Sequence, residues 1–202
     1  MSNDVKAKID GLVRREIAMG DSSFARRIIT DGGDSGFYNA RECRISYEFT
    51  LDWASSQVRV LKFISPMDFM LKSQTMSCDQ GGIIFRAYRS TQGSEGGTFS
   101  TTVPSYLNNF MSEAPSYTPM ISITTGGTFT PDGGQPSVET IRQVANIGGG
   151  GPTSGSRNTV QGGVSGVRGL AAGTYYLTFS IITGVTVDSI GVYDLVFEER
   201  ET

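Results

Sequence analysis

Acidic side chains are the residues of this chain whose types and spacing come closest to catalytic chemistry. Glu48 and Asp52 stand four positions apart in a segment of alternating character, so a strand would carry both on one face. Other carboxylates fall in expected loops or strand ends, at Glu113, Asp132 and Glu139. A pair of carboxylates can hydrolyse a glycosidic bond. Any β-protein contains such pairs by chance, however, so their presence does not predict a hydrolase.

Histidine, the commonest general acid–base group, is absent from the 202 residues. Ser–His and Cys–His nucleophile pairs and histidine metal ligands are therefore excluded. None of the lysines lies in a Ser-x-x-Lys setting, and there is no Gly-Lys dipeptide for a Walker A loop. The segment DGGDSG (31–36) lacks the spacing and terminal Glu of an EF-hand. We predict no catalytic residue, no cofactor, no metal site and no enzymatic activity.

Composition and charge limit the kinds of partner and the locations to be expected for this chain. The net charge of −3 gives no reason to expect binding to nucleic acid. No apolar run is long enough to span a membrane, and the N-terminal MSNDVKAKID has charges where a secretion signal needs apolar residues. Cys43 and Cys78, the two cysteines, are expected to be reduced thiols in or near the core.

The first part of the chain, residues 1–36, is predicted to be an arm with one helix followed by the glycine-rich hinge 31–36. Its apolar residues fall close to helical spacing, with charged residues between them: Val5, Ile9, Leu12 and Ile17. This stripe is narrow, so the helix would need a partner to be stable. The helix either packs on its own domain or docks on a neighbouring subunit. In the second case these four residues bind the partner.

After the hinge the sequence period changes to two. The run 44–53, RISYEFTLDW, alternates strictly between apolar and polar residues, which predicts a strand with Trp53 facing the core. Val58, Val60 and Phe63 are expected to continue the pattern in the next run, 57–64. Gly126 and Gly127 are expected to let the chain reverse or bulge between paired strands. Further strands are predicted at 57–64, 69–78, 82–89, 119–125, 127–130, 138–146, 173–183 and 190–198. In the run 82–89, Ile83, Phe85 and Ala87 share one face.

Residues 37–202 are therefore predicted to form a mainly β domain, an antiparallel β-sandwich or jelly-roll. The segment 148–169 is so rich in Gly, Ser and Thr that it predicts a long loop within this domain. The last strand is acidic, with Glu198 and Glu199 near its end. Such a strand either blunts a sheet edge against aggregation or meets a basic neighbour.

Aromatic residues leave saccharide binding open as a second class of function. Five of them could stack on a sugar ring: Trp53, Tyr88, Tyr106, Tyr117 and Tyr176. The alternation places Trp53 in the core with its neighbours, whereas Tyr176 lies on the opposite face from Tyr175. Tyr176 is therefore the better surface candidate.

The order of segments from 43 to 200 resembles a known group of phage proteins. IIFRAYRST is followed by YLNNFMSEAPS, ISITTGGTFTPDGGQ, a glycine-rich insert, GLAAGTYYLTFS and the acidic VYDLVFEERE. This order resembles small β-sandwich proteins encoded among the head genes of tailed bacteriophages, the auxiliary, decoration or head-fibre proteins. The resemblance implies attachment to a major capsid protein and assembly as a symmetric homo-oligomer, with a trimer favoured. It supplies no catalytic residue, and residues 1–42 lie outside it.

The leading hypothesis is a structural virion protein of a tailed phage, made in the host cytoplasm. It would bind the capsid exterior as a decoration, cement or fibre-base subunit, with the major capsid protein or other virion proteins as partners. The first alternative is a lectin-like host-binding module, suggested by the aromatics and the loop 148–169. The second is a structural component of the neck, collar or tail.

Overall fold

A computed structural model describes the side chains of residues 41–108, 117–145 and 168–199, and the strand positions of residues 6–9, 12–18 and 24–29. Within these residues the fold is mainly β, as the alternating runs predicted, and the paired strands are antiparallel. The only helical element among them is the short 3-10 turn η1 (Ser90–Gln92).

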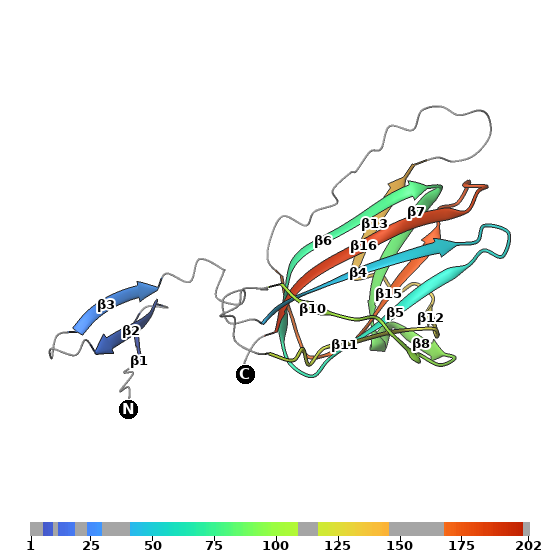
Figure 1. The fold of residues 1–202 in the computed structure, drawn as a ribbon. Coiled ribbons are helices and arrows are strands. Elements are labelled where there is room, and N and C mark those ends of the chain that lie inside the picture. Colours follow the sequence, from blue (N-terminus) through green and yellow to red (C-terminus); the bar gives the residue numbers. More distant parts are fainter. Residues whose placement is uncertain are drawn as a thin grey trace.

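Two sheets make up the main body, as Figure 1 shows. The five-stranded sheet has the order β10 (Tyr106–Leu107), β4 (Glu42–Leu51), β16 (Ser189–Glu199), β6 (Phe69–Gln80) and β14 (Arg168–Leu170). The six-stranded sheet has the order β13 (Glu139–Val144), β7 (Gly82–Arg89), β15 (Gly173–Ile181), β5 (Val58–Ser65), β11 (Ser122–Thr125) and β9 (Thr101–Thr102). A separate two-stranded antiparallel pair consists of β8 (Gly93–Gly96) and β12 (Thr128–Pro131), which lie far apart in the sequence.

The chain alternates between the sheets, so most neighbours in space are distant in sequence. β4 and β16, the first and last long strands, pair from Glu42 opposite Glu198 to Leu51 opposite Ser189. β16 also pairs with β6, and in the other sheet β15 lies between β5 and β7. Each sheet therefore needs a C-terminal strand, β16 or β15, to join the strands on either side of it.

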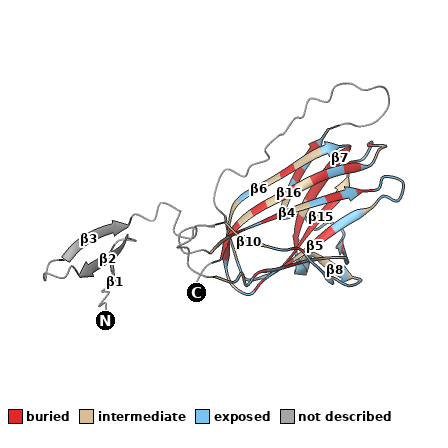
Figure 2. Cartoon of the chain, viewed as in Figure 1, coloured by how far each residue is buried: buried red, intermediate tan, exposed pale blue. Residues whose placement is uncertain are grey.

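The apolar faces of the two sheets supply one shared core. Figure 2 shows buried residues along the strands of both sheets, and in β4 and most of β16 they alternate with less buried ones. Aromatic rings from opposite sheets meet there, with ring centroids 4.6 Å apart for Phe49 and Phe179 and 5.1 Å apart for Phe85 and Tyr193. Such pairs contribute about 0.5–1.5 kcal/mol each beyond the burial of their area. The inward-facing residues predicted for β7, Ile83, Phe85 and Ala87, are all buried, and that prediction is confirmed.

A close approach of the backbone at Gly191 explains why no larger residue stands at this point of β16. A Cβ atom there would clash with Ile83 Cδ1 and come within 2.7 Å of the Ser77 carbonyl oxygen. The register between β16 and β6 also shifts at this position. Glycine thus allows the two sheets to pack closely beside the bulge.

An ion pair links the sheets at their β13 and β14 edges. Arg168 Nη2 lies 2.8 Å from Glu139 Oε1, joining an edge strand of one sheet to an edge strand of the other. Beside it lies a mainly apolar cavity of about 40 Å³, which Gln74 and Tyr193 help to line. A water molecule needs about 10–15 Å³ of such volume, so this space is too small for a larger ligand.

The helix predicted in the N-terminal arm is not confirmed. The described residues there form three antiparallel strands, β1 (Lys6–Ile9), β2 (Leu12–Ala18) and β3 (Phe24–Ile29). The segment is rich in β-branched residues, which lower helix propensity and favour strands. A narrow helical stripe also cannot hold a short helix without a partner, whereas strand pairing supplies backbone hydrogen bonds within the arm. The hinge 31–36 lies outside the described residues.

Two predictions for the β4–β5 region are wrong. β4 ends at Leu51, so Trp53 belongs to a turn and is 45% exposed instead of facing the core. Val58 and Val60 do not continue the inward pattern either, because the turn changes the phase of the alternation. Val58 is exposed and Val60 is buried on the outer face, while Leu61 and Phe63 enter the core.

Three further expectations need correction. Gly126 and Gly127 do not join paired strands, because β11 pairs with β5 and β9 whereas β12 pairs with β8. The long loop predicted at 148–169 ends earlier, since Arg168 and Gly169 already belong to β14, and the rest lies outside the described residues. The acidic final strand is not an edge, because β16 runs between β4 and β6.

Candidate functional site

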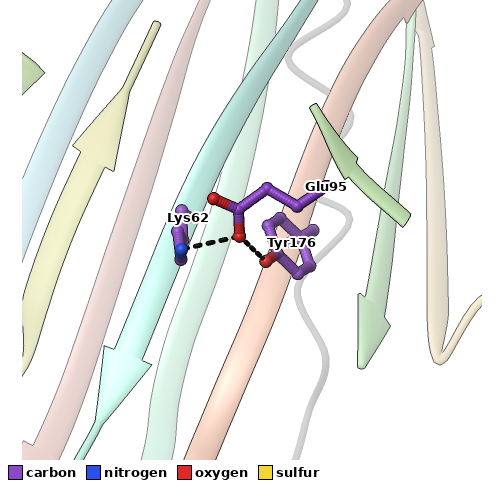
Figure 3. A network of polar contacts seen from close by, with 3 residues as sticks. All are labelled: Lys62, Glu95 and Tyr176. Carbon is purple, nitrogen blue, oxygen red and sulfur yellow. Dashed lines mark hydrogen bonds and ion pairs between the residues drawn. The ribbon is translucent and has the colours of Figure 1, made fainter. Parts of the chain in front are cut away.

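The outer face of the six-stranded sheet carries a polar cluster of Lys62, Glu95 and Tyr176 (Figure 3). The registers of β5, β15 and β7 place Lys62 opposite Tyr176, and Tyr176 opposite Tyr88. Glu95 reaches this face from β8. Its Oε2 lies 2.6 Å from Lys62 Nζ and also accepts a hydrogen bond from the Tyr176 hydroxyl.

An aromatic cluster holds the β8–β12 pair on the same face. Phe129 of β12 stacks on Tyr176 with 4.2 Å between ring centroids and 11° between ring planes. The ring centroids of Tyr88 and Phe129 are 5.6 Å apart, and those of Phe99 and Tyr176 are 5.9 Å apart. Together with Val60, these residues form a second, smaller core outside the main one.

The electrostatics of this cluster suit a structural link between β8 and the sheet better than an acid–base centre. The hydrogen bonds from Lys62 and then from Tyr176 lower the pKa of Glu95 below its ordinary value. Burial, followed by the hydrogen bond to Glu95, raises the pKa of Tyr176 above its ordinary value. Near neutral pH Glu95 is therefore ionised and Tyr176 protonated, and neither is poised to exchange a proton.

Glu199 forms a second polar cluster near the end of β16. Its side chain is fully buried, and its carboxylate accepts backbone N–H bonds from Met120 at 2.9 Å and from Ile121 at 2.7 Å. The Tyr117 hydroxyl donates a third bond to the same carboxylate. The guanidinium of Arg41 lies over the Tyr117 ring, 5.3 Å from its centroid. Glu199 thus anchors the segment before β11 to the central strand.

Burial raises the pKa of Tyr117 and of Cys43, two groups near Glu199. The pKa of Tyr117 is raised first by burial and then by its hydrogen bond to Glu199. Burial, together with the carboxylates of Glu199 and Glu42, raises the pKa of Cys43 to about 12, so this thiol stays protonated. Burial also raises the pKa of Cys78. Both cysteines are free, Cys43 in the core and Cys78 half-buried, as predicted.

The other acidic residues considered for catalysis have local roles. Asp52 accepts a hydrogen bond of 2.8 Å from the Ala54 N–H within the turn, and Glu139 pairs with Arg168. Glu48 lies exposed on β4, and Glu113 is outside the described residues. Glu198 pairs with Lys72, at 2.7 Å between Oε2 and Nζ, and both side chains are largely buried. Lys72 of the adjacent strand β6 therefore pairs with one of the two final carboxylates within the sheet.

The aromatic candidates are distributed differently from the prediction. Tyr176 does lie on the other face of the sheet from Tyr175, as predicted. The Phe129 ring covers the Tyr176 side chain, however, so only 3% of Tyr176 is exposed. Tyr88 is also buried. Tyr106 on β10 and Trp53 in the β4–β5 turn are exposed, at 55% and 45%. Trp53, which the alternation assigned to the core, is thus exposed, and Tyr176, the predicted surface residue, is buried.

The four predicted partner-binding residues of the arm are described only by strand position. Val5 lies outside the described residues. Ile9 at the end of β1 pairs with Leu12 at the start of β2, and Ile17 pairs with Ala25 of β3. Their role in binding a partner stays a prediction.

Two kinds of feature are absent from the described residues. No group of three or more His, Cys, Asp or Glu side chains in that part of the chain is placed to hold a metal ion. No helix among the same residues has the length and apolar character needed to cross a membrane. Asp31 and Asp34 lie outside them.

Comparison with known proteins places the chain in no family. No protein-family model matches it, and neither a curated protein nor a solved structure does.

Proposed function

We propose that this chain is a structural virion protein of a tailed phage that binds the capsid exterior as a decoration, cement or fibre-base subunit. The observation that carries the proposal is the order of the eight principal strands: β4-β16-β6-β14 in one sheet and β13-β7-β15-β5 in the other. This order supports a jelly-roll sandwich, in which the chain crosses repeatedly between the two layers. Jelly-rolls are common in viral capsid and lectin domains.

The polar clusters are consistent with a role in binding. The Glu95 cluster holds β8 on the sheet, and the Glu199 cluster holds the segment before β11. Each connects parts of the chain and leaves no reactive group facing a ligand. A decoration protein needs only binding energy: an interface of about 1,600 Å² repeated over a lattice stabilises a shell without any chemistry.

The proposed partners are the major capsid protein or other virion proteins, together with further copies of the chain in a homo-oligomer, for which we favour a trimer. We assign the arm to the capsid contact, including Val5, Ile9, Leu12 and Ile17. The resemblance of residues 43–200 to auxiliary head proteins and the separate three-stranded sheet of the arm support this division of roles. The proposed location is the virion, after synthesis in the host cytoplasm.

The experiment is to locate the chain in purified particles. Particles from cultures that carry the gene are washed, labelled with antibody to the full chain, and viewed by immunogold electron microscopy. We expect label on the head exterior and a fixed mass ratio to the major capsid protein. Absence of the chain from washed particles would overturn the proposal, and label confined to the neck or tail would overturn the capsid assignment.

A variant tests the arm separately. A chain that begins at residue 37 should keep the oligomeric state of the full chain, measured by light scattering, and fail to join particles. Full incorporation of this shortened chain would refute the role of the arm in the capsid contact. A second variant keeps the full length of the chain and replaces Val5, Ile9, Leu12 and Ile17 by Ser. It should show the same loss of incorporation.

A further inference from the structure

We infer that an open groove beside Trp53 binds a neutral saccharide. The groove has a volume of about 290 Å³, close to the lower end of the range of about 300–1,000 Å³ found for small-molecule sites. Its walls come from the β4–β5 turn and from the end of β15 with the loop that follows. This site goes beyond the proposed capsid role and holds or fails independently of it.

The turn that carries Trp53 is built to keep its shape. The Trp53 backbone N–H donates to Asp188 Oδ1 at 2.9 Å, which ties the turn to the loop before β16. The Ser56 N–H donates to the Trp53 carbonyl oxygen at 3.1 Å, and Ser56 adopts a left-handed conformation with φ of 51°. Asp52 and Gln57 add two further hydrogen bonds across the turn. The loop opposite is fixed as well, because Ile182 and Val185 pack against Ile84.

The indole is available to a ligand. Trp53 is 45% exposed although tryptophan is on average a highly buried residue, and it lies at the rim of a groove. A flat aromatic face next to polar groups suits a pyranose, since one face of the sugar presents C–H groups and its edge presents hydroxyls. Tryptophan supplies this contact at a low cost in side-chain entropy.

The other lining residues favour a neutral, hydroxyl-rich ligand. Hydroxyl groups come from Ser56, Ser180 and Thr183, and peptide groups are available around Gly184. Among the described residues no charged one lines the groove, so nothing there would neutralise a phosphate, a sulfate or an ammonium group. The polar walls would also leave an apolar ligand with unsatisfied groups around it. A neutral sugar unit satisfies both requirements.

A single tryptophan in the sequence makes the test direct, because all indole fluorescence reports on this groove. The full chain is titrated with a panel of neutral mono- and oligosaccharides and, in parallel, with sulfated and phosphorylated ones. We expect at least one neutral saccharide to shift or quench the Trp53 emission in a saturable way. A stronger response to the anionic sugars, or no response to any saccharide, would overturn the inference.

Variants confirm the location on an array of the same saccharides. Trp53→Ala should weaken binding at least about tenfold. Tyr106→Ala, which removes another exposed aromatic, on β10, should leave binding unchanged. Thr183→Lys adds a charge at an exposed position of the groove and should weaken binding while the indole remains. Thermal unfolding checks that each variant is folded.

Two results would contradict the site. Retained binding by both Trp53→Ala and Thr183→Lys would place any saccharide elsewhere on the chain. An emission change caused by phage capsids and by no saccharide would instead identify the groove as a protein contact surface.

Discussion

Glu199 and Glu95 each accept a hydrogen bond from a tyrosine hydroxyl, yet the surroundings of the two carboxylates differ. Glu199 is fully buried and receives its other bonds from the backbone N–H groups of Met120 and Ile121. The Glu95 side chain is 36% exposed and receives its other bond from the partly exposed Lys62. The same functional group is thus used once inside the protein and once at its surface.

The comparison teaches that the surroundings decide how much a carboxylate stabilises the fold. If Glu199 is removed, the buried Ile121 N–H loses its acceptor, and so do the partly buried Met120 N–H and Tyr117 hydroxyl, which is costly. If Glu95 is removed, water can satisfy Lys62, and an exposed ion pair contributes little. The following substitutions test this difference.

The largest effect is expected for Glu199→Ala. The variant should lose about 3 kcal/mol of unfolding free energy, because the buried Ile121 N–H and the partly buried Met120 N–H and Tyr117 hydroxyl lose a charged acceptor together. Urea denaturation followed by circular dichroism measures the loss. Glu48→Ala, at an exposed position of the neighbouring strand β4, is the control and should change stability by less than about 0.5 kcal/mol. Equal losses for the two variants would contradict the anchoring role of Glu199.

An intermediate effect is expected for Tyr117→Phe, which removes one donor to Glu199 and leaves the two backbone bonds. We expect a loss of about 1–2 kcal/mol, since the bond involves a buried charged acceptor. Tyr176→Phe removes the corresponding bond at the surface cluster and should cost less than Tyr117→Phe, because water can reach Glu95. Thermal melts of the two variants under one condition give the comparison, and the reverse order would break it.

The smallest effect is expected for Glu95→Gln, below about 1 kcal/mol near neutral pH. Because the pKa of Glu95 is lowered in the folded state, its contribution is present above the unfolded pKa and lost as the pH falls through the folded pKa. The difference between wild type and variant should therefore shrink in acid and in high salt. A difference that stays constant from neutral pH to acid would show that Glu95 does not act through its charge.

Much of the strand content could be predicted from the sequence. In the runs that became β4, β7, β15 and β16, apolar residues recur at every second position, and a period of two is a local property that needs no knowledge of the partner strand. The inward positions of β7 followed in the same way. The absence of histidine likewise restricts the chemistry, because it is a property of the composition alone.

Predictions failed where a residue depends on something distant in the chain. The arm offered apolar residues near helical spacing, but pairing among three short strands governs its described residues. Trp53 continued a perfect alternation, and only the end of β4 at Leu51 places it in a turn. Tyr176 lies on the outer face as expected, but the ring of Phe129, from the distant strand β12, covers it.

By itself, the sequence determined that this is a mainly β protein with no histidine chemistry, because composition and alternation are carried by neighbouring residues. Only the tertiary structure decided which acids are buried, which aromatic is exposed, and that the final strand is central. These properties arise from contacts between segments far apart in sequence: Lys62 with Glu95 and Tyr176, and Glu199 with Tyr117 and Ile121. Local patterns cannot specify such contacts, because burial and pairing are created only when the sheets close around their common core.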